Sequence, residues 1–148
     1  MLVTRLLWID CIGAALAGTA VLGLSGWLSR LEGLPQSVLV FTGVANLLYG
    51  AFSFSLAVRA ERPLALLRLL VAANLLWVPV CLGLLAAFSA TATPWAAAHL
   101  VGEAIYVGGL AVLEWRNRHR LASAAPRRAD GPPLLRRAQH GSRPSAPR

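Results

Sequence analysis

Long apolar runs separated by short polar segments dominate the chain up to residue 115. Four runs, at about 6–29, 36–58, 64–88 and 95–115, contain very few charged residues. Each is at least as long as the ~20 residues that cross a bilayer. The runs lack the broad polar face of a soluble amphipathic helix, and lipid offers no partner for an exposed backbone group. The pattern therefore predicts four transmembrane helices.

Short connections between the runs favour a simple order of helices. Pro35, Pro63 and Pro94 stand at the predicted starts of the second, third and fourth helices, where a missing backbone N–H costs little. Connections of this length join antiparallel neighbours. We therefore predict an all-α fold, an up-down bundle of four transmembrane helices within residues 1–116.

The composition agrees with a membrane location. Hydrophobic residues make up 57% of the chain, above the ~45–50% of soluble domains. All 14 basic residues are arginine, and alanine, glycine and proline are abundant, which is typical of a GC-rich bacterial genome. We expect a multi-pass protein of the bacterial cytoplasmic (inner) membrane.

Residues 117–148 differ from the apolar runs. They contain eight arginines and one acidic residue, Asp130, with little that could be buried. We predict a basic, disordered cytoplasmic tail, whose expected partners are anionic lipid head groups at ~1 kcal/mol per arginine. No aromatic residue lies between these arginines, so nucleic-acid binding is not expected.

Arginine is also concentrated at one end of the predicted bundle. The N-terminus, the second connection and the end of the fourth helix contain Arg5, Arg59, Arg62, Arg68, Arg116, Arg118 and Arg120. The opposite end contains Arg30. The positive-inside rule then places both termini in the cytoplasm.

Polar side chains within the runs mark the candidate functional residues, because such groups are costly in lipid and usually face the bundle interior. The predicted intramembrane polar cluster contains Asn46, Tyr49, Asn74, His99, Glu103 and Tyr106. Glu103 lies near the middle of its run. A charged carboxylate there costs at least ~2.5 kcal/mol, so we expect Glu103 to be neutral unless a cation accompanies it.

Two hypotheses follow for this cluster. In the first, the polar groups bond to one another and fix helix packing, at ~0.6–2 kcal/mol per bond. In the second, Glu103 exchanges protons or binds a cation in a small proton-coupled carrier. A homo-oligomer is compatible with both. The hypotheses differ on whether a water-reachable cavity touches Glu103.

A further contact is expected between Asp10 and Arg68, which lie at similar depths on the first and third helices and could form an ion pair. The alternative is that Arg68 extends to lipid phosphate.

His99 and Glu103 have a spacing that could share a metal ion, but structural zinc takes four ligands. We therefore expect no metal and no cofactor. No nucleophile–base arrangement or nucleotide motif is present, so we do not expect an enzyme.

The second and fourth helices resemble one another. Thr42, Asn46, Tyr49 and Arg59 lie 57 residues before His99, Glu103, Tyr106 and Arg116, respectively. If this reflects a two-helix duplication, its halves would be parallel repeats.

Short motifs resemble those of small, uncharacterised bacterial four-helix integral membrane proteins. They are Asp10 in the first helix, "GLP" at 33–35, "NLLW" at 74–77 and "LEWR" at 113–116. The resemblance covers residues 5–120 and implies the fold and an inner-membrane location, without an activity. Small multidrug resistance transporters also have four helices and one membrane carboxylate. Theirs lies in the first helix, whereas Glu103 is in the fourth.

Overall fold

The computed structural model describes residues 2–123, which form four α-helices and no β-strand. The helices are α1 (Leu2–Glu32), α2 (Gln36–Ala57), α3 (Leu64–Ala87) and α4 (Pro94–Ser123). All four are long and apolar enough to cross a membrane, which indicates a multi-pass membrane protein and confirms the predicted all-α fold. Most of the predicted tail, residues 124–148, lies outside the described residues.

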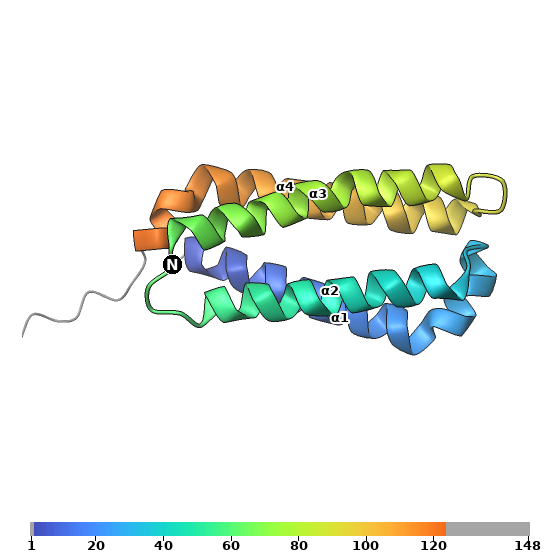
Figure 1. Ribbon diagram of the computed structural model, residues 1–148, viewed down its shortest axis with the longest axis horizontal. Helices are drawn as coiled ribbons and strands as arrows, with labels where there is room; N and C mark the ends of the chain where they lie inside the picture. Colours follow the sequence, from blue (N-terminus) through green and yellow to red (C-terminus); the bar gives the residue numbers. More distant parts are fainter. Residues whose placement is uncertain (1, 124–148) are drawn as a thin grey trace, which may run out of the picture.

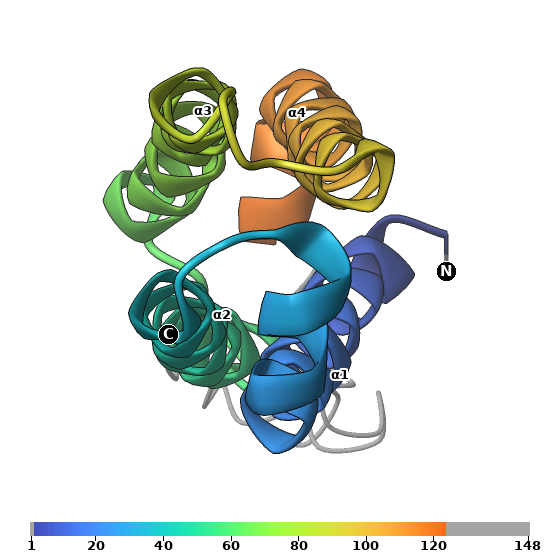
Figure 2. The same ribbon diagram turned by 90° about the vertical axis from the view of Figure 1, so that its right-hand side faces the viewer.

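The helices form two antiparallel hairpins that lie side by side (Figure 1). One hairpin is α1 with α2 and the other is α3 with α4, and both pairs pack closely along their lengths. Across the two hairpins, α1 contacts α4, whereas α2 and α3 hardly touch (Figure 2). The bundle is therefore tightly packed within each hairpin and loosely packed between α2 and α3.

Small residues allow α1 and α2 to approach closely, as small side chains do at membrane helix interfaces. A Cβ atom added to Gly18 would lie 2.8 Å from the carbonyl oxygen of Gly43. One added to Gly50 would lie 3.3 Å from the backbone nitrogen of Ala15. The backbones of α1 and α2 are thus in contact at two levels of the first hairpin.

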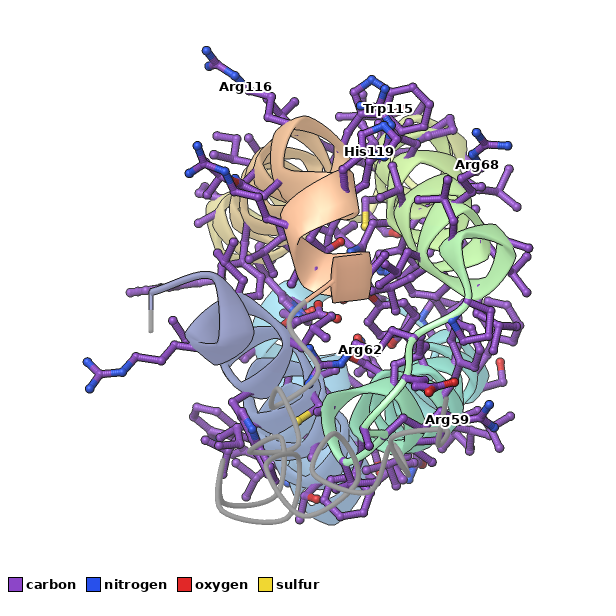
Figure 3. All side chains as sticks on the ribbon, turned by 90° about the vertical axis from the view of Figure 1, so that its left-hand side faces the viewer. Arg59, Arg62, Arg68, Trp115, Arg116 and His119 are labelled. Atoms are coloured by element: carbon purple, nitrogen blue, oxygen red, sulfur yellow. The ribbon has the colours of Figure 1, made fainter. Side chains whose placement is uncertain are left out.

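The hairpin turns meet at one end of the bundle. The backbone N–H of Thr93 donates to the carbonyl of Glu32 at 2.9 Å, and its hydroxyl donates to the carbonyl of Leu31 at 2.9 Å. Gly33 has a φ of +71°, and a Cβ atom there would collide with the carbonyl of Thr91. We call this the turn end. The opposite, arginine-rich end holds the start of α1, the end of α4 and the α2–α3 connection (Figures 1 and 3).

At the arginine-rich end, the fourth helix continues beyond the predicted membrane span. The apolar run ends at about residue 115, and α4 continues to Ser123. Leu121 in this extension is buried against a cluster that includes Leu7, Leu56 and Leu67. Packing of one apolar side chain among charged neighbours therefore extends the helix beyond the apolar run.

Arg62 joins the two hairpins at this end. Its side chain is 7% exposed and donates to three carbonyl oxygens, of Leu56 (2.9 Å), Ala57 (3.0 Å) and Leu121 (3.4 Å). The first two belong to the last turn of α2, where helix carbonyls have no partner within the helix. In Figure 3, Arg62 lies toward the middle of the bundle, while Arg68 and Arg116 point away from it.

Candidate functional site

A cavity of about 390 Å³ lies in the middle of the bundle and receives side chains from all four helices. Asp10, Asn46, Asn74 and Glu103 contribute polar groups to its wall. The aromatic wall residues are Phe41, Tyr49, Trp77 and Tyr106, and the others are alanine, glycine, valine and leucine. Among the residues that the structure describes, the wall contains no arginine.

The cavity opens sideways, between α2 and α3. Two of its wall residues, Phe41 on α2 and Leu76 on α3, are 56% and 68% exposed. These helices are also the pair that hardly touches. In a multi-pass membrane protein, a lateral opening between two helices lies beside the surrounding lipid.

Glu103 joins the two hairpins at the cavity wall. Its Oε1 atom accepts a hydrogen bond from Asn46 Nδ2 at 2.7 Å and one from Trp77 Nε1 at 2.9 Å. Asn46 belongs to the first hairpin, and Trp77 and Glu103 belong to the second. The Oε2 atom of Glu103 is buried and has no hydrogen-bond partner among the described residues. One oxygen of Glu103 therefore links the hairpins through Asn46, and the other accepts no hydrogen bond from the described residues and lies 3.7 Å from His99 Nε2.

Asn46 and Glu103 occupy equivalent positions in the 57-residue correspondence between the second and fourth helices. In the structure these equivalent positions contact each other across the hairpin boundary. Tyr49 and Tyr106 form another equivalent pair, and both hydroxyl groups donate to neighbouring residues of α1: Tyr49 to Asp10 Oδ2 at 2.7 Å and Tyr106 to the carbonyl of Ile9 at 3.1 Å.

His99 lies between two carboxylates. Its Nδ1 atom is 3.0 Å from Glu32 Oε1, and its Nε2 atom is 3.7 Å from Glu103 Oε2. The sequence predicted one polar cluster that contains His99 and Glu103. The shorter contact is instead with Glu32, the last residue of α1.

Asp10 lies on the cavity wall but on the arginine-rich side of Glu103. The side chain is 1% exposed, and its Oδ2 atom accepts hydrogen bonds from Tyr49 at 2.7 Å and Ser53 at 2.6 Å. The predicted ion pair with Arg68 does not form within the described part of the chain, and that prediction was wrong. Depth along the helices was similar, but Arg68 is exposed and faces away from the bundle (Figure 3).

Asn74 also has an unexpected partner. Its Nδ2 atom donates to Glu114 Oε2 at 3.3 Å, and Glu114 is 1% exposed. The six predicted residues therefore do not form one cluster. Asn46 contacts Glu103, and His99 lies beside Glu103. The other three, Tyr49, Asn74 and Tyr106, lie nearer the arginine-rich end.

The polar cluster predicted from the sequence did not include Glu32, Trp77, Glu114 or Arg62. The sequence could have indicated a role for Trp77, because it is the tryptophan that lies in the middle of an apolar run and not at its edge. Glu32 and Arg62 were read as connection residues, and their burial depends on how the turns fold over them.

Metal binding finds no support in the side-chain geometry. Between residues 5 and 122, no group of three or more histidine, cysteine, aspartate or glutamate side chains is placed to hold a metal ion. The carboxylates nearest His99 lie on different ring nitrogens, so they cannot join it around one ion.

Comparison with known proteins gives no further assignment. No protein-family model matches the chain, and neither a curated protein nor a solved structure is detectably similar to it.

Proposed function

We propose that this protein is a small carrier of the bacterial inner membrane that exchanges protons for an amphipathic organic cation bound in the central cavity. The observation that supports it is the position of Glu103, whose Oε2 atom is buried and unpartnered at the wall of a 390 Å³ cavity. The size of the cavity falls within the ~300–1,000 Å³ of ligand pockets.

The class of ligand follows from the lining. Two carboxylates, Asp10 and Glu103, face the cavity; its described wall holds no arginine, and His99 lies 3.7 Å from Glu103 Oε2 just outside it. Asp10 accepts hydrogen bonds from Tyr49 and Ser53. Because a carboxylate without a balancing charge is costly inside a membrane, we assign the exchange of a proton for a cationic ligand to Glu103. The aromatic rings favour an organic cation through cation–π attraction. The opening toward lipid favours one that partitions into the membrane.

Orientation and partners complete the proposal. Arg59, Arg62 and the other arginines gathered at one end favour a cytoplasmic location for that end and both termini. The arginines of residues 117–148 would contact anionic lipid head groups there. The protein is proposed to act without a cofactor and without enzymatic activity, as a monomer or homo-oligomer.

The test is transport by the full chain in liposomes, with tetraphenylphosphonium and ethidium as probes. An outward proton gradient is expected to drive accumulation of at least one probe by the wild type, and Glu103→Gln is expected to abolish it. Glu61→Gln is the matched control because Glu61 is an exposed carboxylate of the α2–α3 connection. The proposal is wrong if neither probe moves, or if folded Glu103→Gln transports as well as the wild type.

The second candidate function is purely structural, and the two bonds accepted by Glu103 Oε1 favour it. Glutamine retains a carbonyl acceptor in that place, whereas leucine leaves Asn46 and Trp77 without a partner. If the role is structural alone, Glu103→Leu lowers thermal stability in detergent, Glu103→Gln does not, and no transport depends on either. Transport that is lost in the stable Glu103→Gln variant would exclude this alternative.

A further inference from the structure

The side chain of His99 lies between the buried carboxylate of Glu32 and the partly buried carboxylate of Glu103, which belong to different hairpins. Each ring nitrogen faces one of them, at 3.0 Å from Glu32 Oε1 and 3.7 Å from Glu103 Oε2. Both Glu32 Oε2 and Glu103 Oε2 are buried without a hydrogen-bond partner among the described residues. A histidine in this position can accept a proton on one nitrogen and release one from the other.

The three groups form a path along the bundle axis. Glu32 is the last residue of α1, at the turn end. His99 lies on the first turns of α4, and Glu103 is one turn deeper, ~6 Å by helix rise, on the cavity wall. Side chains of two helices thus link the end of the bundle to the cavity.

The turn end is mostly apolar around this path. One hydrophobic cluster at that end contains the buried residues Leu34, Leu39, Ala96 and Leu100. The polar path therefore passes through a layer that is otherwise apolar. From α3 the buried thiol of Cys81 lies near Glu103, and α2 contributes the amide of Asn46.

Toward the arginine-rich end, the polar groups beyond Glu103 are the buried carboxyls of Asp10 and Glu114, with Asn74 donating to Glu114. Between Asp10 and that end lie fully buried leucines from all four helices: Leu7, Leu56, Leu67, Leu70 and Leu121. Arg62 behind them donates to backbone carbonyls only. Within the described residues, the ion-pair contact of Glu103 itself is with His99, which lies on the side of the turn end.

We infer that His99 transfers protons between Glu32 at the turn end and Glu103 in the cavity. Glu32 gives its proton to Nδ1, which forms an imidazolium. The Nε2–H proton then passes to Glu103 Oε2 once that distance shortens to about 2.8 Å. The ring is left neutral with its proton on Nδ1, and Glu32 is left as a carboxylate that accepts a bond from Nδ1–H. Loss of the Nδ1 proton to water and protonation of Nε2 from water, at the partly exposed ring, restore the starting tautomer.

This inference rests on the proposed exchange at Glu103, and the test separates the two. Tetraphenylphosphonium is bound to the purified full chain, and its release after a rapid drop in pH is followed in a stopped-flow instrument. His99→Gln and Glu32→Gln are each expected to slow release at least ~10-fold, since positioned proton transfer contributes ~10²–10⁴-fold. The affinity at equilibrium should stay within about twofold of the wild type, because Glu103 itself remains.

Two further measurements identify proton transfer as the cause. Imidazole added to His99→Ala is expected to restore the release rate, which a role in packing would not allow. His119→Gln, at the arginine-rich end of α4, is the matched histidine control and should release at the wild-type rate.

The possible failures are distinct. If Glu103→Gln releases the cation with the same pH dependence as the wild type, the proposed exchange is wrong and the relay with it. If Glu103→Gln abolishes that dependence while His99→Gln and Glu32→Gln both release at the wild-type rate, the exchange stands and the relay is wrong. Failure of imidazole to restore a slowed His99→Ala would also overturn the relay.

Discussion

Replacing Arg62 by glutamine should loosen the arginine-rich end of the bundle. The buried guanidinium donates to Leu56, Ala57 and Leu121, with two of the three bonds at 3.0 Å or less. A hydrogen bond to a charged group contributes ~1.5–3 kcal/mol. Burial also lowers the pKa of the Arg62 guanidinium, because desolvation penalises its charge, and this cost offsets part of the gain. We therefore expect Arg62→Gln to lower the free energy of unfolding by about 2–4 kcal/mol.

The assay is unfolding of the full chain in mixed micelles, followed by tryptophan fluorescence. Arg59→Gln is the matched control, since Arg59 is an exposed arginine of the same connection and should change stability by less than ~0.5 kcal/mol. Arg62→Lys should fall between them, because an ammonium group cannot reach three carbonyls in a fixed plane. Equal stability of Arg62→Gln and Arg59→Gln would refute the assigned role of Arg62.

Two other changes test contacts inside the first hairpin. Gly18→Ala should lower the free energy of unfolding by ~1–3 kcal/mol, because the new methyl group collides with the backbone of Gly43. Gly23→Ala, where the new methyl group meets nothing within 4 Å, should be neutral or slightly stabilising. Equal thermal stability of the two variants would contradict this packing. Asp10→Leu should lower the free energy of unfolding by ~1–3 kcal/mol, because it leaves the hydroxyl groups of Tyr49 and Ser53 without an acceptor. Asp10→Asn keeps an acceptor, and Arg68→Gln should leave stability unchanged. Destabilisation by Arg68→Gln would instead support an ion pair between Asp10 and Arg68.

The sequence predicted the helices well because the signal for a membrane span is simple. Four apolar runs separated by short turns determine four spans whatever the details of packing, and the structure has all four. The continuation of α4 was not part of the prediction, because hydropathy falls at Trp115 and Arg116; in the structure Leu121 packs against Leu7 and Leu56. That contact joins distant parts of the chain and leaves no local pattern.

The sequence indicated how deep the polar side chains lie along the helices, but not which way they point around each helix axis. It predicted one polar cluster that contains Asn46, Asn74 and Glu103, and Asn46 does contact Glu103. Similar depth suggested a pair between Asp10 and Arg68, which face different directions because rotation about each helix axis depends on its neighbours. Asn74 reaches Glu114 for the same reason.

Proton release during cation binding is the most direct test of the central claim that Glu103 holds either a proton or a cation. Titration calorimetry of the purified protein with tetraphenylphosphonium, in buffers of different ionisation enthalpy at one pH, measures this number. We predict release of about one proton per cation bound by the wild type and none by Glu103→Gln. Binding without proton release, or equal release by both proteins, would contradict the claim.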